Sequence, residues 1–304
     1  MNRSVAIGYG FLVAAILMWS GNAVIARAAM MSDVPPITFS FYRWLIACLV
    51  FLPFSARGVW LHRHVFIKKW WYFAFFGLIS VACFNSFFYI GLQSTTAIQG
   101  SLIQAILPVL VLMLVVTVLR EPIGGQQILG VILSILGAAV ILLRGDPELA
   151  LSLRLNIGDL WCLGAVFLWS IQLLILRWKP TEIPMPAFMT VVVAWGVAFL
   201  VPAWLWEAST GRELVLNTTN LMFLGYVVIA ASVFGTTLFN SGVLRVGPTN
   251  SGYFGNLYPV FASVLAVLFL GESFEWFHGA GGALVLSGIY FATMAQRKRV
   301  TVAE

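Results

Sequence analysis

The sequence predicts an all-α integral membrane protein, in which ten transmembrane helices form two inverted repeats of five. Three observations predict this fold. Only 9% of the 304 residues are charged and 61% are apolar, whereas a soluble domain carries about 25% charged residues. The apolar residues form runs of about 20, the length that crosses the hydrocarbon core of a bilayer. The third observation is an internal repeat over most of the chain.

The apolar runs define the predicted helices in order. Strands of a membrane β-barrel would alternate apolar and polar residues, but runs such as 107–119 are apolar at both parities. Only helices then satisfy the backbone in lipid. The first run follows Arg3 as a signal peptide would, but at about 24 residues it is too long for one, and we expect it to be retained. The predicted helices cover residues 6–30, 37–55, 70–90, 97–118, 124–143, 157–178, 186–207, 219–241, 248–270 and 276–295.

The basic residues orient these helices. With the N-terminus inside, 12 of the 17 Lys and Arg residues fall in cytoplasmic segments, four fall in outer segments, and Arg43 lies within a helix. The positive-inside rule therefore predicts a bacterial-type inner-membrane protein with both termini in the cytoplasm. The net charge of +6 comes from residues between the apolar runs. Because these residues form no basic stripe, the expected partner is the lipid bilayer and not nucleic acid.

The internal repeat divides the chain into residues 1–148 and 149–304. Trp19-Ser20 recurs as Trp169-Ser170 at an offset of 150, and the offset becomes 151 after one inserted residue. Each repeat holds five predicted helices, and an odd number makes the second copy enter the membrane from the opposite side. Inverted repeats are typical of alternating-access carriers, whose substrate site lies near the midplane. The pairs in register are Pro35 and Pro186, Trp44 and Trp195, Gly91 and Gly242, Pro108 and Pro259, Glu121 and Glu272, Gly130 and Gly281, and Gly137 and Gly288.

The motifs of both halves resemble those of a known family. They are Trp-Ser-Gly-Asn at 19–22, Arg43, Pro108, Arg120-Glu121, Gln127, Gly130 and Gly137, then Pro259, Gly271-Glu272, His278, Gly281 and Gly288. The set resembles the drug/metabolite transporter superfamily, and within it the ten-helix EamA-type exporters. The general look is nearest to that family's aromatic amino-acid exporter. The resemblance implies that helices one to four and six to nine surround a central cavity, with helices five and ten at the periphery. Arg43 departs from the symmetry, because Ala194 occupies the matching position.

Polar side chains near the middle of a membrane helix usually face a partner helix or a cavity. Trp19 and Asn22 are three residues apart and share a helix face, and Trp169 and Gln172 repeat that pair. An indole can contact a cation or an aromatic ring, and an amide can bind either end of a zwitterion. The alternative is hydrogen bonding between helices, which needs no substrate. The predicted substrate-binding residues are Trp19, Asn22, Asn85, Tyr89, Gln104, Trp169, Gln172, Tyr253 and Asn256, with Thr236 and Asn240 as weaker candidates.

Arg43 and two mid-helix prolines each have two open interpretations. Arg43 lies about 9 Å along its helix. It could bind a substrate carboxylate, or it could have a structural role by snorkelling to the interface or bonding carbonyls of a neighbouring helix. Pro108 and Pro259 each remove a backbone donor and favour a kink. These matched kinks would either gate the cavity or be static.

Other polar residues are expected to have structural roles. Glu121 and Glu272 precede helices at matched junctions, where a carboxylate meets the positive helix end. Asp159 begins the sixth predicted helix and is interpreted as a cap. The three cysteines lie in apolar runs without CxxC spacing, so no metal site and no cofactor are predicted.

These observations predict a carrier that exports amino acids, aromatic and other neutral ones, and related small metabolites. The alternative is a multidrug or cationic-compound exporter of the same superfamily, which would normally need a carboxylate within the membrane. An enzyme is not expected, because the three histidines lie in loops or near helix ends and no nucleophile or acid–base pair is visible. Since no proton-relay residue is embedded in a predicted helix, we expect facilitated transport. We also expect a monomer or a weak homo-oligomer.

Overall fold

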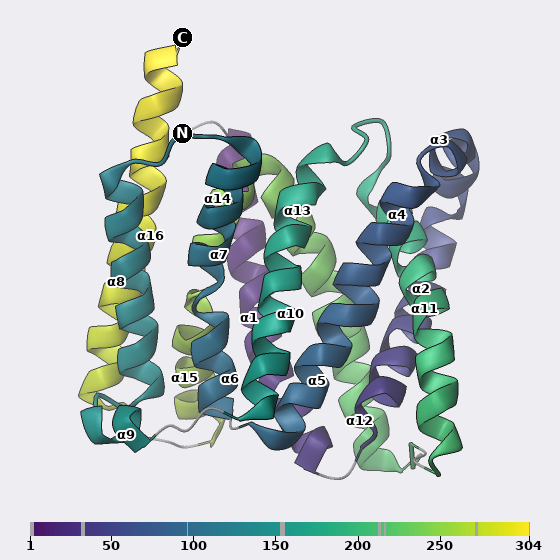
Figure 1. Ribbon diagram of the computed structural model, residues 1–304, viewed down its shortest axis with the longest axis horizontal. Helices are drawn as coiled ribbons and strands as arrows, with labels where there is room; N and C mark the ends of the chain where they lie inside the picture. Colours follow the sequence, from purple (N-terminus) through teal and green to yellow (C-terminus); the bar gives the residue numbers. More distant parts are fainter. Residues whose placement is uncertain are drawn as a thin grey trace.

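The computed structural model describes residues 3–31, 34–95, 97–152, 156–211, 214–215, 217–270 and 273–303. Long helices run between the same two ends of the molecule (Figure 1). The described residues form α-helices, short π- and 3-10-helical segments and no strand. They therefore confirm the predicted all-α fold.

The helices follow the order that the apolar runs predict. The first half contains α1 (Arg3–Met31), α2 (Pro36–Leu61), α3 (Arg63–Lys68), α4 (Trp70–Gly77), η1 (Leu78–Cys83), α5 (Phe84–Ser94), α6 (Ala97–Gln104), α7 (Leu107–Leu114), η2 (Val115–Leu119) and α8 (Gly125–Leu142). The second half contains α9 (Pro147–Ser152), α10 (Ile157–Ile175), η3 (Leu176–Trp178), α11 (Met185–Ser209), α12 (Thr218–Tyr226), η4 (Val227–Gly235), α13 (Thr236–Val246), α14 (Pro248–Phe254), α15 (Leu257–Leu270) and α16 (Trp276–Ala303).

Eight stretches of the described residues are long and apolar enough to cross a membrane. They correspond to the first eight predicted spans, and the other two predicted spans are helical as α14 with α15 and as α16. The count of ten spans stays a prediction. Helix α2 continues to Leu61, beyond the predicted end at residue 55, because hydropathy marks the part of a helix that suits lipid and not the end of its hydrogen bonding.

Helices at equivalent positions of the two repeats pack against each other. α2 lies along α11, and α8 lies along α16 at one edge of the bundle (Figure 1). The contact between α8 and α16, which we call the glycine seam, consists of Gly130, Gly137, Gly281 and Gly288. A Cβ atom on Gly137 would lie 2.6 Å from the carbonyl oxygen of Gly281, and one on Gly288 would lie 2.5 Å from that of Gly130. The helix backbones therefore touch, and residues with side chains would not fit.

Four predicted helices are interrupted at matched positions. The π-helical segments η1 and η4 occupy equivalent parts of the third and eighth spans. The fourth and ninth spans break between α6 and α7 and between α14 and α15, just before Pro108 and Pro259. Ala105 N–H donates to Leu102 O at 3.1 Å, and the equivalent Asn256 N–H donates to Tyr253 O at 3.2 Å. Both breaks thus tighten into 3-10-type turns at matched positions, where proline removes the helical donor.

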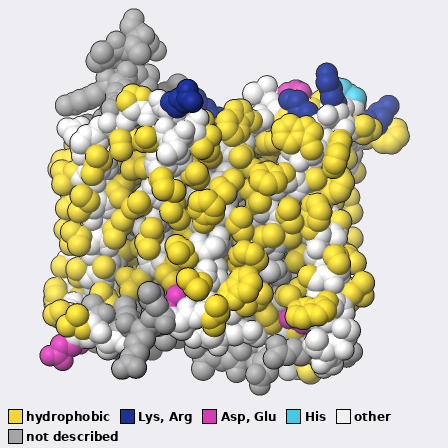
Figure 2. Space-filling model, in the orientation of Figure 1, with side chains coloured by type: hydrophobic (Ala, Val, Ile, Leu, Met, Phe, Trp, Pro, Cys, Tyr) yellow, Lys and Arg dark blue, Asp and Glu magenta, His cyan; other side chains and the backbone are white. Residues whose placement is uncertain are grey.

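The two ends of the bundle differ in charge. α1 begins and α16 ends at one end of the molecule (Figure 1), which we call the basic end. Figure 2 shows Lys and Arg side chains at this end, above a side surface that is mostly hydrophobic. Among the described side chains, this end carries nine basic residues and two acidic ones: Arg3, Arg57, Arg63, Lys68, Lys69, Arg120, Arg177, Lys179 and Arg245, with Glu121 and Glu182. The opposite end carries Arg144, Asp146, Glu148, Asp159, Glu207 and Glu275 among the described side chains. This asymmetry fits the predicted orientation.

Candidate functional site

A cavity lies inside the bundle and is lined by residues of spans one to four and six to nine. The volume of this cavity is about 90 Å³. No described residue of α8 or α16 belongs to its lining, so the pair at the edge of the bundle lies outside the site. The resemblance implied this arrangement.

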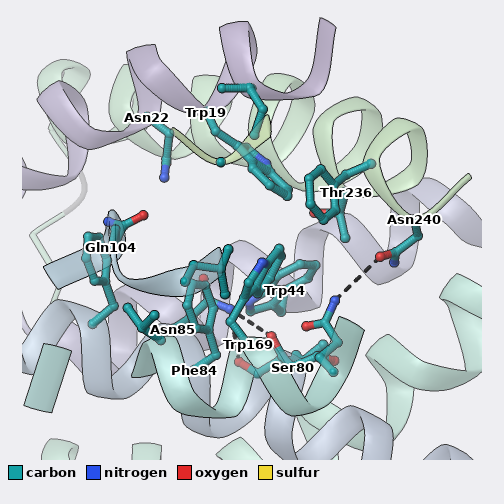
Figure 3. Close-up of a pocket in the computed structure, with 18 of the residues that line it drawn as sticks. Trp19, Asn22, Trp44, Ser80, Phe84, Asn85, Gln104, Trp169, Thr236 and Asn240 are labelled. Carbon is teal, nitrogen blue, oxygen red and sulfur yellow. Dashed lines mark hydrogen bonds between the residues drawn. The ribbon is translucent and has the colours of Figure 1, made fainter. Parts of the chain in front are cut away.

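The cavity brings together eight of the residues singled out in the sequence. They are Trp19, Asn22, Arg43, Asn85, Tyr89, Gln104, Trp169 and Gln172, and the weaker candidates Thr236 and Asn240 join them. Figure 3 shows seven of them around the cavity, on helices far apart in the sequence: Trp19, Asn22, Asn85, Gln104, Trp169, Thr236 and Asn240.

Tyr253, Asn256, Pro108 and Pro259 are not part of this lining. Asn256 is buried and donates from Nδ2 to Ser134 Oγ of α8 at 3.0 Å, so it links helices instead of facing the cavity. The prediction extrapolated a regular helical face through the ninth span. The break before Pro259 turns Gly255 and Tyr258 to the cavity in their place.

An aromatic group, which we call the aromatic belt, crosses the middle of the cavity. The ring centroids of Trp19 and Trp169 are 5.2 Å apart in an edge-to-face arrangement. Phe84 lies 4.6 Å from Trp169, and Phe239 lies 4.7 Å from Trp19. Trp19 Nε1 donates to Ala231 O at 2.9 Å, which fixes its ring. The belt offers flat apolar surfaces to a ligand in the cavity.

Arg43 is buried, with 4% of its surface exposed, and it faces the cavity. Its Nε donates to Ser232 Oγ at 2.6 Å, and its Nη1 donates to Asn85 Oδ1 at 2.9 Å and to Tyr89 Oη at 2.5 Å. All three acceptors are neutral side chains. Among the described residues, Arg43 thus bonds side chains of α5 and η4 and not main-chain carbonyls, and these bonds join α2 to both elements.

The π-helical segments explain how the acceptors around Arg43 are held. A wide π turn leaves carbonyl oxygens without their usual helical donors. Asn85 Nδ2 donates to Ser80 O at 3.2 Å and to Val81 O at 3.3 Å, which turns its Oδ1 to Arg43. At the equivalent place in the second repeat, Thr236 Oγ1 donates to Ala231 O at 3.1 Å. Both repeats use a cavity side chain to satisfy their own interrupted helix.

A second polar group lies on the other side of the aromatic belt. Gln172 Nε2 donates to Asn240 Oδ1 at 3.4 Å, and Asn240 Nδ2 contacts Met189 Sδ at 3.2 Å. These two hydrogen bonds join α10, α13 and α11. Figure 3 shows Asn240 and Thr236 on one side of Trp19 and Trp169, and Asn22 and Gln104 on the other.

Most of the lining consists of pairs that the repeat relates. At an offset of 150 or 151 the pairs are Ile16 and Val166, Trp19 and Trp169, Asn22 and Gln172, Asn85 and Thr236, Phe88 and Phe239, Tyr89 and Asn240, Gln104 and Gly255, and Leu107 and Tyr258. The cavity therefore lies where the halves meet. Arg43 breaks the symmetry and gives one side of the belt a positive charge.

Three buried polar atoms of the lining have no hydrogen-bond partner among the described residues. They are Asn22 Oδ1, Trp44 Nε1 and Gln172 Oε1. A buried polar atom without a partner is costly, and seven more such atoms in the described part of the chain lie outside the lining, on residues such as Thr38, Ser86 and Asn256. Trp44 and Met189 also line the cavity, although they are not among the predicted site residues. Trp44 entered the prediction only as a repeat marker, but its position directly after Arg43 indicates a place in the site.

Comparisons with known proteins agree with this architecture. The chain is 27% identical over 292 residues to the uncharacterized transporter YetK of Bacillus subtilis (strain 168), covering 94% of this chain and 87% of that protein. It is 24% identical over 301 residues to an uncharacterized transporter of Archaeoglobus fulgidus, covering 94% and 97%. It is 25% identical over 317 residues to the WAT1-related protein At4g30420 of Arabidopsis thaliana, covering 93% and 84%. One crystal structure matches the fold with a TM-score of 0.76 at 18% identity, covering 98% of this chain and 99% of that one.

The family match appears once in each half of the chain. The EamA-like transporter family matches residues 6–143 and again residues 156–294. Both segments contribute helices to the cavity, and together they contain its whole described lining. The chain therefore belongs to the EamA-like transporter family and is a multi-pass membrane transporter of the drug/metabolite transporter superfamily.

Proposed function

We propose that this transporter exports small zwitterionic metabolites, chiefly aromatic and other neutral amino acids, by alternating access. The observation that supports this most is the charge of Arg43, which lies at an aromatic cavity and forms no ion pair with a described carboxylate. An unpaired buried charge is expensive. A substrate carboxylate would supply the missing counterion.

Arg43 has donors left for such a carboxylate. A guanidinium carries five N–H donors, and three are used on Ser232, Asn85 and Tyr89. Nη2 donates to no residue among those described, so its two N–H groups are available to an anion. Planar guanidinium and carboxylate groups match in shape, and charge-assisted hydrogen bonds are stronger than neutral ones.

The remaining parts of a neutral amino acid have complementary partners. Asn22 Oδ1 has no donor among the described residues and suits the substrate ammonium. Figure 3 shows Asn22 on the same side of the belt as Gln104. The side chain would then lie against Trp19, Trp169, Phe84 and Phe239. This pose places the polar and apolar parts of the substrate against matching surfaces.

The alternative substrate class, cationic drugs, has less support. A cation would normally pair with a carboxylate, and no Asp or Glu belongs to the described lining. The two buried carboxylates outside the lining have other roles: Asp159 accepts from Asn156 N–H, and Glu207 accepts from the first N–H groups of α2. Arg43 would repel a cation from the same cavity.

Counterflow into liposomes that contain the purified protein tests the proposal. We expect labelled tyrosine or phenylalanine to exchange, and Arg43→Gln to lower exchange about 10- to 100-fold, since a hydrogen bond to a charged group is lost. Arg57→Gln is the matched control, because Arg57 is an exposed residue near the end of the same helix. The proposal is wrong if folded wild-type protein exchanges none of the twenty amino acids, or if Arg43→Gln exchanges them normally.

We also propose that transport is facilitated and that the basic end faces the cytoplasm of a bacterial-type inner membrane. The described lining contains no Asp, Glu or His to relay a proton, and the charge asymmetry of the ends supports the orientation. Collapsing the proton gradient should leave counterflow unchanged. Loss of flux at an unchanged substrate gradient would contradict facilitated transport.

A further inference from the structure

We infer that Gln172 is a specificity-determining residue, whose Oε1 accepts a hydrogen bond from the far end of the substrate side chain. The transporter then prefers amino acids whose apolar side chain ends in an O–H or N–H donor over those that end in C–H. This inference rests on the proposed function and extends it from the class of substrate to a preference within that class.

The orientation of the Gln172 amide follows from its neighbours. The thioether of Met189 is a weak acceptor and cannot donate, so the Asn240 side chain must turn its NH₂ group to the sulfur, 3.2 Å away. Asn240 Oδ1 then faces Gln172, and the Gln172 NH₂ group must donate to it. Oε1 is consequently the free end of the Gln172 amide. If the Asn240 amide were reversed, its Oδ1 would face Met189 Sδ, and if the Gln172 amide were reversed, its Oε1 would face Asn240 Oδ1. In both cases two acceptor atoms would face each other.

Gln172 Oε1 is a buried acceptor in the cavity wall without a donor. Only 1% of the Gln172 surface is exposed, and Oε1 has no partner among the described residues. The Gln172 Nε2 donor already joins α10 to α13. That structural role does not explain why Oε1 is buried without a donor. A ligand donor would satisfy this oxygen, whereas a ligand that presents only C–H would leave it unpaired. Sites with buried polar groups reject ligands that lack the matching group.

The place of Gln172 determines which part of the substrate it contacts. Asn22 lies three residues after Trp19, and Gln172 lies three residues after Trp169. α1 and α10 run in opposite directions, so the two amides diverge from the aromatic belt and are about 9 Å apart along the helix axes. An amino acid whose carboxylate lies at Arg43 and whose ammonium lies at Asn22 would then direct the end of a long side chain, past the aromatic belt, to Gln172.

Matched substrates test this preference on the wild-type protein. Counterflow would be measured with tyrosine and 4-aminophenylalanine, which end in donors, and with phenylalanine and 4-fluorophenylalanine, which do not. We expect the two donors to have KM values about three- to tenfold lower than the other two, the effect of one hydrogen bond. If the donor pair and the non-donor pair have equal KM values, the inference is wrong.

The variant Gln172→Met, which keeps the length of the side chain, removes the acceptor. Because the variant also removes the Nε2 donor to Asn240, the readout is the ratio of the two KM values: we expect the preference for tyrosine over phenylalanine to disappear. Asn22→Met is the contrasting variant, and it should raise the KM values of tyrosine and phenylalanine by the same factor. If Gln172→Met weakens both substrates equally, Gln172 acts through packing and the inference fails. If wild-type protein exchanges neither substrate, the proposed function itself fails, which separates the two outcomes.

Discussion

Replacing Gly137 by alanine should weaken the glycine seam between α8 and α16. The new Cβ would lie 2.6 Å from Gly281 O and 2.7 Å from Val285 N, both backbone atoms, and inside the 3.0 Å that Cβ atoms keep. Backbone atoms of packed helices cannot rotate away, so the helices must separate. Overpacking of this kind costs about 1–3 kcal/mol, part of which is the dispersion energy lost along the opened contact.

Gly282→Ala in α16 is the matched control, because a Cβ there would lie 3.9 Å from Val260 Cγ1, an ordinary van der Waals contact. Both glycines lie inside long helices, so both substitutions gain similar helix propensity, about 1 kcal/mol, and this gain cancels in the comparison. Unfolding by SDS in mixed micelles, followed by the fluorescence of the 12 tryptophans, measures the difference. Gly137→Ala should be less stable than Gly282→Ala by about 1–3 kcal/mol. A difference below about 0.5 kcal/mol would refute the close backbone contact.

Further predictions concern three polar residues at the helix ends. Glu207 accepts from Ile37 N–H at 3.3 Å and Thr38 N–H at 2.5 Å, and so caps the start of α2. Glu207→Ala should lower the free energy of unfolding by about 1–2 kcal/mol in the SDS assay. An unchanged midpoint of SDS unfolding would contradict this capping role. Both partners of the Arg177–Glu121 ion pair are about half exposed. Arg177→Gln should therefore lower the free energy of unfolding by less than about 1 kcal/mol in the same assay. A larger loss would contradict this prediction. Burial lowers the pKa of Lys179, although Glu182 partly offsets this effect. The folded protein therefore loses this proton before the unfolded chain does, and stability should rise with pH between the lowered pKa and the ordinary value of 10.5. The free energy of unfolding of Lys179→Met should lack this rise with pH. If the variant and the wild type show the same pH dependence of stability, the lowered pKa of Lys179 does not contribute to it.

The sequence predicted the helices and much of the cavity because both follow from regular spacing. Trp19 with Asn22 and Trp169 with Gln172 share helix faces in uninterrupted helices, and all four side chains line the cavity. Tyr253 and Asn256 lie next to the break between α14 and α15, where a 3-10-type turn changes which residues face inward. A helical wheel cannot follow such a change of phase.

The contacts of Arg43 could not be predicted from the chain alone. Its partner Ser232 belongs to η4 of the other repeat, and a π segment leaves no clear mark in an apolar run. The pairing also depends on how Asn85 satisfies the carbonyls of its own π turn. Long-range packing and local backbone geometry together fix this interaction.

The glycine seam also has a consequence for motion. Its four glycines pair across the repeats, Gly130 with Gly288 and Gly137 with Gly281, so rotation about the axis that relates the halves maps the seam onto itself. In a carrier that works by exchanging the conformations of its halves, inward-open and outward-open states can share one unchanged seam. α8 and α16 would then keep their contact while the helices that line the cavity move relative to them.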